Sequence, residues 1–253
     1  MERKIALVTG ATSGIGKATA IALARLGYDI IGTGRRKDRL EGLARELPDG
    51  IRFLPLLFDV RDHDAVRQHL LNLPEDWAAI DVLVNNAGNA HGFDPIQSGN
   101  PEDWDAMIDI NVKGLLYVSK ALIPGMTQRM GGTIVNIGSI AGKEVYPNGN
   151  VYCASKHAVD ALTKGMRMDL NPFGIRVIGV HPGLVETEFS LVRFKGDAER
   201  SKSVYKGFEP LTAEDIADTI AFAVSRPAHV VLADIVILPT AQGAATLVKK
   251  NLP

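Results

Sequence analysis

Short runs of apolar residues alternate with longer amphipathic segments along the whole chain, and this alternation limits the fold more than any other feature. The runs are continuous, which is typical of strands covered by helices on both faces of a parallel sheet. Strands are predicted at Ile5–Thr9, Asp29–Thr33, Arg52–Leu57, Val82–Asn85, Thr133–Ile137, Arg176–His181 and Val230–Leu238. Helices are predicted at Gly14–Leu26, Arg39–Leu47, Asp62–Leu73, Trp104–Met130, Asn150–Asn171 and Ala213–Ser225. The pattern predicts an α/β, doubly wound sheet of about seven mostly parallel strands with helices on both faces.

The whole chain, residues 1–253, is expected to form a single domain, because no linker-like segment, repeat or low-complexity stretch divides it. The stretch around residues 186–209 is more charged and less regular than its surroundings. Segments that follow the carboxyl end of a strand overhang the crevice of such a sheet. We therefore expect this stretch to cover a substrate.

The composition excludes several classes of protein. Lys and Arg total 28 and Asp and Glu total 29, so the chain lacks the basic excess of a nucleic-acid-binding protein. Its one cysteine, Cys153, forms neither an internal disulfide nor a Cys-rich zinc site, and the six histidines show no metal-ligand spacing. No targeting sequence is visible, and no apolar stretch approaches the ~20 residues that span a bilayer. We expect a cytoplasmic protein with no metal, nucleic-acid or membrane partner.

A glycine-rich turn connects the first predicted strand to the first predicted helix. Its residues are Gly10, Ala11, Thr12, Ser13, Gly14, Ile15 and Gly16. Such a turn places backbone N–H groups and the positive end of a helix beside a bound pyrophosphate, and side chains at the glycine positions would block that approach. We expect this turn to bind a dinucleotide. The alternative is an ordinary tight turn between strand and helix.

The second predicted strand leads into two adjacent arginines, Arg35 and Arg36. Folds that bind NAD usually place an acidic residue here, against the hydroxyls of the adenosine ribose, but this chain has no acid before Asp38. A guanidinium pairs well with a 2′-phosphate through its charge and its fork geometry. The arginines therefore favour NADP(H). The alternative is an ordinary, solvated basic start of a helix.

Tyr152 and Lys156 are spaced to lie on the same face of one predicted helix. A nearby ammonium stabilises tyrosinate, which would lower the pKa of the phenol from its usual value near 10. Such a tyrosine exchanges a proton with an alcohol or carbonyl oxygen. The same spacing is common in surface helices, so it becomes informative only together with other motifs.

Several motifs together resemble the short-chain dehydrogenase/reductase family over essentially the whole chain. In order, they are Thr9-Gly10-x-x-x-Gly14-Ile15-Gly16, Asn85-Asn86-Ala87-Gly88, Asn111, Ser139, Tyr152-x-x-x-Lys156 and Pro182-Gly183. Independent motifs in this order and spacing are highly specific. The resemblance implies a Rossmann-type oxidoreductase that acts on CH–OH groups. A catalytically inactive cofactor sensor is disfavoured, because such proteins usually lose the tyrosine or the lysine.

The resemblance implies a role for each matching residue. Tyr152 would be the general acid in carbonyl reduction and the base in alcohol oxidation, and Ser139 would hold the substrate oxygen beside it. Lys156 would bind the nicotinamide ribose and lower the pKa of Tyr152, and Asn111 would support a water that links Lys156 to solvent. The other residues implied to line the cofactor are Asp59, Val60, Asn86, Ala87, Gly88, Pro182, Gly183, Val185 and Thr187.

The chain is more closely similar to the NADP-dependent 3-hydroxy acid dehydrogenases, also called serine or allo-threonine dehydrogenases. The similarity lies in Thr33-Gly34-Arg35-Arg36, in residues 182–197 and in Pro227-Ala228-His229-Val230. It implies hydride transfer between a small 3-hydroxy acid, such as serine, allo-threonine or 3-hydroxypropionate, and its oxo acid or semialdehyde. The alternative is a broader carbonyl or aldehyde reductase of the same family, of the 3-oxoacyl-carrier or sulfoacetaldehyde type.

A small carboxylate substrate requires a cation in its pocket. Arg193 and Lys195, in the charged stretch after Pro182-Gly183, are the candidates, and we place Arg193 with Ser139 and Tyr152 at the substrate. The alternative is a surface charge cluster.

The two longest predicted helices, Trp104–Met130 and Asn150–Asn171, carry apolar residues on more than one face. Such a helix usually meets a second partner. The family resemblance implies a homotetramer built partly through these helices, and the alternative is a monomer.

Overall fold

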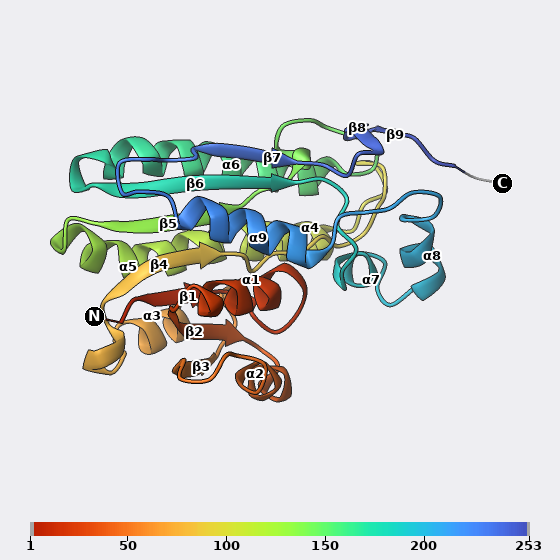
Figure 1. Ribbon diagram of the computed structural model, residues 1–253. Coiled ribbons are helices and arrows are strands. Elements are labelled where there is room, and N and C mark those ends of the chain that lie inside the picture. The colour runs from red at the N-terminus through yellow and green to blue at the C-terminus, as the bar shows by residue number, and fades with distance from the viewer. Residues whose placement is uncertain (1–2, 252–253) are drawn as a thin grey trace.

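Seven parallel strands form the central sheet of the computed structural model, which describes residues 3–251 (Figure 1). Their order across the sheet is β3-β2-β1-β4-β5-β6-β7. The strands are β1 Ile5–Val8, β2 Asp29–Gly34, β3 Phe53–Leu57, β4 Ile80–Asn85, β5 Gly132–Ile137, β6 Ile175–Pro182 and β7 Asp234–Ile237. The predicted doubly wound α/β fold is confirmed. The order reverses between β1 and β4, and ligands of such sheets bind beyond the carboxyl ends of the strands at that point.

Nine α-helices lie within the described residues, and most of them cover the two faces of the sheet. They are α1 Gly14–Arg25, α2 Lys37–Ala44, α3 His63–Leu70, α4 Pro101–Ile108, α5 Leu115–Gln128, α6 Asn150–Leu170, α7 Phe189–Arg193, α8 Ala198–Ser203 and α9 Ala213–Val224. Among them, no helix combines the length and the apolar character that a membrane crossing requires.

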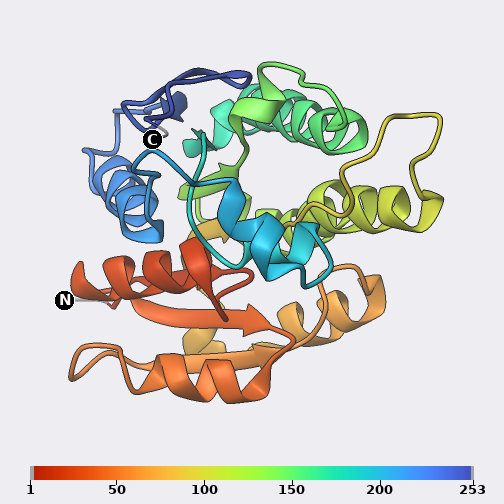
Figure 2. The same ribbon diagram turned by 90° about the vertical axis from the view of Figure 1, so that its right-hand side faces the viewer.

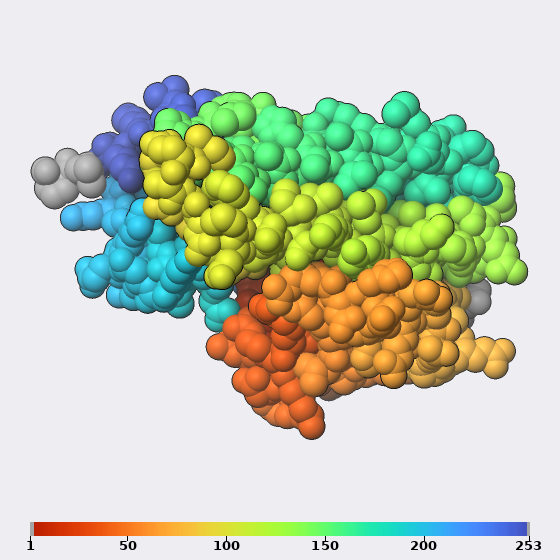
Figure 3. Space-filling model, turned by 180° about the vertical axis from the view of Figure 1, so that it is seen from behind, coloured from red at the N-terminus to blue at the C-terminus, as the bar shows by residue number. Residues whose placement is uncertain are grey.

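Alternate side chains of each strand enter two separate hydrophobic cores. In β1, Val8 packs in a core that contains side chains of α1, α2 and α9. Leu7 points to the opposite face, into a core that contains side chains of α3, α5 and α6. Figure 3 shows the outside of this second layer, with α3 in orange, α5 in yellow-green and α6 in green. Continuous apolar strands are therefore required, because helices cover both faces of the sheet.

The structure corrects two of the predicted elements. The single helix expected over Trp104–Met130 is interrupted by a π-helical segment, Asp109–Gly114, between α4 and α5. The last strand begins only at Asp234, so residues 230–233 of the predicted strand lie outside β7. The other predicted elements are present, with ends that differ by up to a few residues.

The carboxyl ends of the strands all point toward one end of the molecule (Figure 1). The short helices α7 and α8 lie in front of these ends, as Figure 2 shows from that side. A small antiparallel pair, β8 (Gln242–Ala244) and β9 (Leu247–Val248), belongs to the same end. The segment of residues 186–209 therefore overhangs the strand ends.

Candidate active site

One crevice at the carboxyl ends of the strands brings together most of the residues predicted to form a site. It has a volume of about 920 Å³. All the predicted cofactor, catalytic and substrate residues line it except Gly16 and Asn111. Residues from both ends of the chain contribute, from Gly10 to Thr246. All the predicted residues but these two therefore share one crevice.

The glycine turn has the backbone shape that the sequence predicts. Gly10 and Gly14 have φ angles of +67° and +51°, in the left-handed region that side chains disfavour. A Cβ on Gly16 would lie 2.3 Å from the carbonyl oxygen of Gly10, so Gly16 allows α1 to pack closely against the turn. The hydroxyl of Thr9 accepts hydrogen bonds from the backbone N–H groups of Asn86 and Ala87, at 3.0 and 2.9 Å. The turn is therefore fixed to the residues that follow β4.

Arg36 lies across the glycine turn, directly before α2. Its Nη2 donates to the hydroxyls of Thr12 at 3.1 Å and Ser13 at 2.8 Å. Its Nη1 donates to the carboxylate of Glu188 at 2.9 Å. Arg35 is more exposed and lies 3.5 Å from Asp59, an ion pair between two predicted cofactor residues. Of the two arginines, Arg36 is therefore the one anchored to the turn.

Ser139, Tyr152 and Lys156 come together from two elements. Ser139 follows β5 and caps a short 3₁₀ segment, Ile140–Gly142, by accepting a hydrogen bond from the N–H of Ala141 at 3.1 Å. Tyr152 and Lys156 lie in the first two turns of α6. All three side chains are buried. The Nζ of Lys156 donates to the carbonyl of Ile137 at 2.9 Å, which joins α6 to the end of β5.

The pKa of Tyr152 differs from the expectation. Burial raises the pKa of this phenol, the nearby Tyr146 raises it further, and the Ser139 hydroxyl and the Arg193 guanidinium lower it. The ammonium of Lys156 lies 6.0 Å from the centre of the Tyr152 ring. Burial also lowers the pKa of Lys156, to about 8, so part of its charge is lost near neutral pH. In this structure burial therefore dominates the pKa of Tyr152, and its lowering by Lys156 stays a prediction.

Asn111 lies in the π-helical segment and outside the crevice. Its side chain donates to the carbonyl of Asn89 at 2.8 Å and to the hydroxyl of Ser155 at 3.0 Å. Its amide oxygen accepts from the N–H of Asn89 at 2.9 Å. Asn111 thus holds the chain after Gly88 against α6. π-Helical segments are frequent at functional sites, but a single sequence carries no clear signal for one.

Arg193, at the end of α7, points into the crevice, whereas Lys195 does not. The guanidinium of Arg193 lies 4.7 Å from the centre of the Phe93 ring, 5.5 Å from that of Tyr146 and 5.4 Å from that of Tyr152. Lys195 pairs with the carboxylate of Asp103 at 2.9 Å and does not line the crevice. The structure therefore separates the two candidate cations and leaves Arg193 beside Tyr152.

Sequence reasoning missed several lining residues. Phe93 and Tyr146 come from loops far apart in the chain and form the aromatic surroundings of Arg193. Gln242, in β8, accepts a hydrogen bond from the N–H of Leu184 at 2.9 Å and lies where a Cβ on Gly183 would be. None of these residues forms a local motif, so only the fold reveals them.

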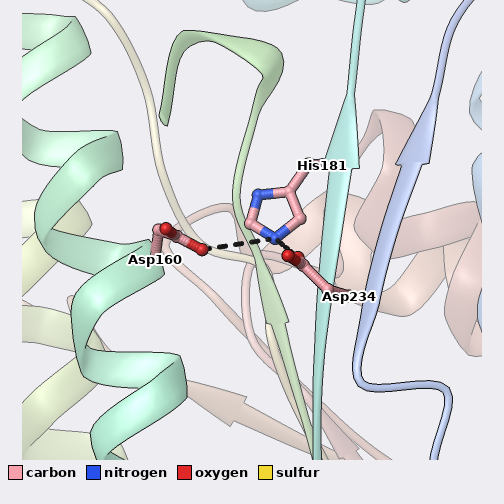
Figure 4. A group of neighbouring side chains, drawn as sticks. All are labelled: Asp160, His181 and Asp234. Carbon is pink, nitrogen blue, oxygen red and sulfur yellow. Dashed lines mark ion pairs between the residues drawn. The ribbon is translucent and has the colours of Figure 1, made fainter. Parts of the chain in front are cut away.

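A second group of charged residues lies beside the site. His181, at the end of β6, is buried, and its Nε2 lies 2.6 Å from the carboxylate of Asp234 and 3.8 Å from that of Asp160 (Figure 4). The ligand atoms of the three residues lie within 4.8 Å of one another, a spacing that suits a metal ion. However, the Nζ of Lys143 donates to both carboxylates, at 2.7 Å each. The lysine is therefore already the cation of this ionic cluster.

Comparisons with known proteins agree with the geometry. Residues 4–197 match the profile of a family described as short chain dehydrogenase. The NADP-dependent 3-hydroxy acid dehydrogenase of Salmonella typhi is 44% identical over 96% of this chain and 98% of its own length. The serine 3-dehydrogenase of Rhizobium radiobacter is 43% identical over 94% and 95%. A solved structure, the closed form of a serine dehydrogenase complexed with NADP+, superposes with a TM-score of 0.91 at 42% identity, covering 98% of this chain and 100% of that one.

Proposed function

The chain belongs to the short-chain dehydrogenase/reductase family, and on this premise we propose that it interconverts a small 3-hydroxy acid and its oxo acid or semialdehyde with NADP(H). The observation that carries the proposal is the position of Arg193, a cation 5.4 Å from the centre of the Tyr152 ring in the same crevice as the glycine turn. A substrate with a carboxylate close to its reacting carbon suits that arrangement.

The residues around the turn fit NADP(H). Gly10 and Gly14 line the crevice, and Arg36, held by Thr12 and Ser13, provides a guanidinium beside the turn for the 2′-phosphate. The relatives named as NADP-dependent support the same cofactor. When bound, the nicotinamide ring supplies or accepts the hydride, and the protein provides position and electrostatics.

Tyr152 is the proposed acid and base. In reduction its hydroxyl donates a proton to the carbonyl oxygen of the substrate, and in oxidation the phenolate receives it back. Ser139, which lines the same crevice and whose hydroxyl lowers the pKa of Tyr152, holds that oxygen in place. Lys156, with a pKa of about 8, carries a proton that it can exchange near neutral pH. Asn111 donates hydrogen bonds to the carbonyl of Asn89 and to the hydroxyl of Ser155, the residue before Lys156. We propose that it supports the water that links Lys156 to solvent.

Residues 186–209 are proposed to cover the substrate. Phe189 in α7 packs on the Tyr152 ring, with 5.5 Å between the ring centres. Tyr205 ties the segment together, because its hydroxyl donates to the carbonyl of Val185 at 2.8 Å and bonds to Ser190 at 2.7 Å. The segment thus places Phe189 and Arg193 over the proposed acid.

The proposed mechanism is tested with Tyr152→Phe, which removes only the hydroxyl. Turnover of serine, allo-threonine or 3-hydroxypropionate should fall about 10²- to 10⁴-fold, the usual contribution of general acid–base catalysis. Binding of NADPH, followed by its fluorescence, should be unchanged and serves as the control for folding. A variant that retains turnover would remove Tyr152 from the mechanism.

The proposed substrate class is tested with Arg193→Met. Loss of a charge-assisted hydrogen bond should raise KM for a 3-hydroxy acid roughly 10- to 100-fold and leave KM for a neutral alcohol unchanged. Lys195→Met is the matched control, because Lys195 is bound to Asp103, and it should leave both values unchanged. Equal losses on both substrates for Arg193→Met would favour the broader carbonyl or aldehyde reductase.

A homotetramer is also proposed, built partly through α5 and α6 on the face seen in Figure 3. In the single chain, Leu116 on α5 is 37% exposed and Met168 on α6 is 72% exposed. Apolar side chains exposed on neighbouring helices are typical of a contact surface. Light scattering should give four times the chain mass of 27.2 kDa, and a mass of one chain would contradict the proposal.

A further inference from the structure

The carboxylate of Glu188 occupies one side of the Arg36 guanidinium. Its Oε2 lies 2.9 Å from Nη1 of Arg36, and its Oε1 lies 3.5 Å from Nη2 of Arg39. The other donors of Arg36 face the hydroxyls of Thr12 and Ser13 on the glycine turn. An anion is therefore already bound at the arginine that is proposed to receive the 2′-phosphate.

The pair of Glu188 and Arg36 is accessible to a competing anion. The side chains are 40% and 41% exposed, so water solvates both partners and the pair contributes little to stability. Arg36 lowers the pKa of Glu188, which keeps this carboxylate ionised at neutral pH. A phosphate brought to Arg36 would meet the negative charge of Glu188, and the two anions cannot share the guanidinium without repulsion.

Glu188 also connects the arginine to the segment that covers Tyr152. It directly precedes α7, whose first residue, Phe189, packs on the Tyr152 ring and whose last residue is Arg193. The preceding Thr187 lies against the glycine turn, where a Cβ on Gly14 would be 3.3 Å from its side chain. A change at Glu188 therefore affects the start of α7.

We propose that Glu188 is a specificity-determining residue that holds Arg36 until the 2′-phosphate of the cofactor displaces it. The displaced carboxylate releases the start of α7, so binding of the phosphate changes the position of the segment that covers Tyr152. A cofactor without the 2′-phosphate leaves the pair of Glu188 and Arg36 intact. This inference rests on the proposed use of NADP(H).

Glu188→Gln tests the competition without any turnover. The probes are 2′,5′-ADP, which carries the 2′-phosphate, and 5′-AMP, which lacks it, each titrated calorimetrically. The variant should bind 2′,5′-ADP about three- to fivefold more tightly than the wild type, the size expected when a half-exposed ion pair no longer competes. Its affinity for 5′-AMP should be unchanged. Glu186→Gln, which removes one exposed charge from the same segment, should bind both probes as the wild type does.

Limited proteolysis with trypsin tests the connection to α7. In the wild type, 2′,5′-ADP should change the rate of cleavage within residues 186–209, and 5′-AMP should not. In Glu188→Gln, cleavage without any ligand should already proceed at the rate of the phosphate-bound wild type.

The outcomes separate this inference from the proposed function. If the wild type prefers 2′,5′-ADP over 5′-AMP but Glu188→Gln binds 2′,5′-ADP equally or more weakly, the role of Glu188 is wrong and the use of NADP(H) stands. If the wild type shows no preference for 2′,5′-ADP, the use of NADP(H) is wrong and this inference fails with it.

Discussion

Two lysines near Ser139 show how differently one fold treats the same ammonium group. Lys143 contacts the carboxylates of Asp160 and Asp234 at 2.7 Å each, and these hydrogen bonds raise its pKa despite partial burial. Lys156 has no carboxylate partner within residues 3–251, and burial lowers its pKa to about 8. Carboxylate partners stabilise the charged form of a lysine and raise its pKa. Burial without such partners lowers the pKa toward neutral pH, where the ammonium can exchange its proton.

Lys156 and Asp160 lie one turn apart on the same face of α6, so the two environments are separated by a single helical turn. The ionic cluster of Lys143, Asp160, His181 and Asp234 joins α6 to β6 and β7, whereas Lys156 is the lysine that we propose to take part in chemistry. His181 precedes the Pro182-Gly183 motif, and Asp160 follows Lys156. The cluster therefore lies directly beside residues of the proposed site on β6 and α6.

The largest effect is expected from Lys156→Met. Turnover should fall about 10²- to 10⁴-fold, because the variant loses the exchangeable proton beside Tyr152. Steady-state kinetics at saturating cofactor measure this loss. Lys164→Met is the control, because Lys164 lies on the same helix, is 52% exposed and contacts Asp160 instead. Near-normal turnover of Lys156→Met would contradict the distinction between the two lysines.

A smaller effect, on stability and not on chemistry, is expected from Lys143→Met. Two carboxylates lose their common cation, and since Asp234 is 40% exposed we expect a loss of about 2 kcal/mol in the free energy of unfolding, below the value for a fully buried pair. Urea unfolding measures it. Turnover should change by less than about threefold, and Lys143→Arg should restore most of the stability. A loss of turnover as large as that of Lys156→Met would show that the two regions are not separate.

The smallest effect is the pH dependence that His181 adds to stability. Burial lowers its pKa below 6.5, with a further lowering by Lys143, while Asp234 and Asp160 oppose the shift. The unfolded chain therefore binds a proton more readily than the folded chain, and stability is lost as pH falls below about 6.5.

Lys143, with a raised pKa, contributes below pH 10.5 and loses its contribution only as pH rises through that raised value. Asp160 and Asp234, with lowered pKa values, contribute above pH 3.8 and lose their contribution only as pH falls through those lowered values. Among the four residues of the cluster, His181 alone has an ordinary pKa between about pH 5 and pH 8, so it is the residue that adds pH dependence in this range.

His181→Asn should remove this part of the pH dependence. When the pH falls from about 8 to about 5, the free energy of unfolding should drop by about 1 kcal/mol more in the wild type than in the variant. Urea unfolding at the two pH values measures the difference, and His229→Asn, an exposed histidine, is the control. A pH-independent difference between His181→Asn and wild type would mean that the folded chain does not disfavour the protonated form of His181.

Local patterns in the sequence predict much of the fold and of the site. Continuous apolar runs specify buried parallel strands, because only a sheet covered on both faces hides both sets of side chains. The glycine turn was predictable because a left-handed backbone at Gly10 and Gly14 requires glycine. The position of Tyr152 and Lys156 on one face of a helix was predictable from their spacing, because helical periodicity brings such residues to the same side. In each case the information lies within a few residues of chain.

Other features depend on contacts between distant segments, and only the tertiary structure decides them. Glu188 meets Arg36 across 152 positions of sequence, and no local pattern predicts that pair. His181 meets Asp234 because β6 and β7 are neighbours in the sheet. Burial raises the pKa of Tyr152 and lowers that of Lys156, and the spacing of the two residues in the sequence does not reveal how deeply they are buried. The sequence by itself determined the elements and the chemical groups, whereas the environment of each group, and hence its charge, was decided by packing.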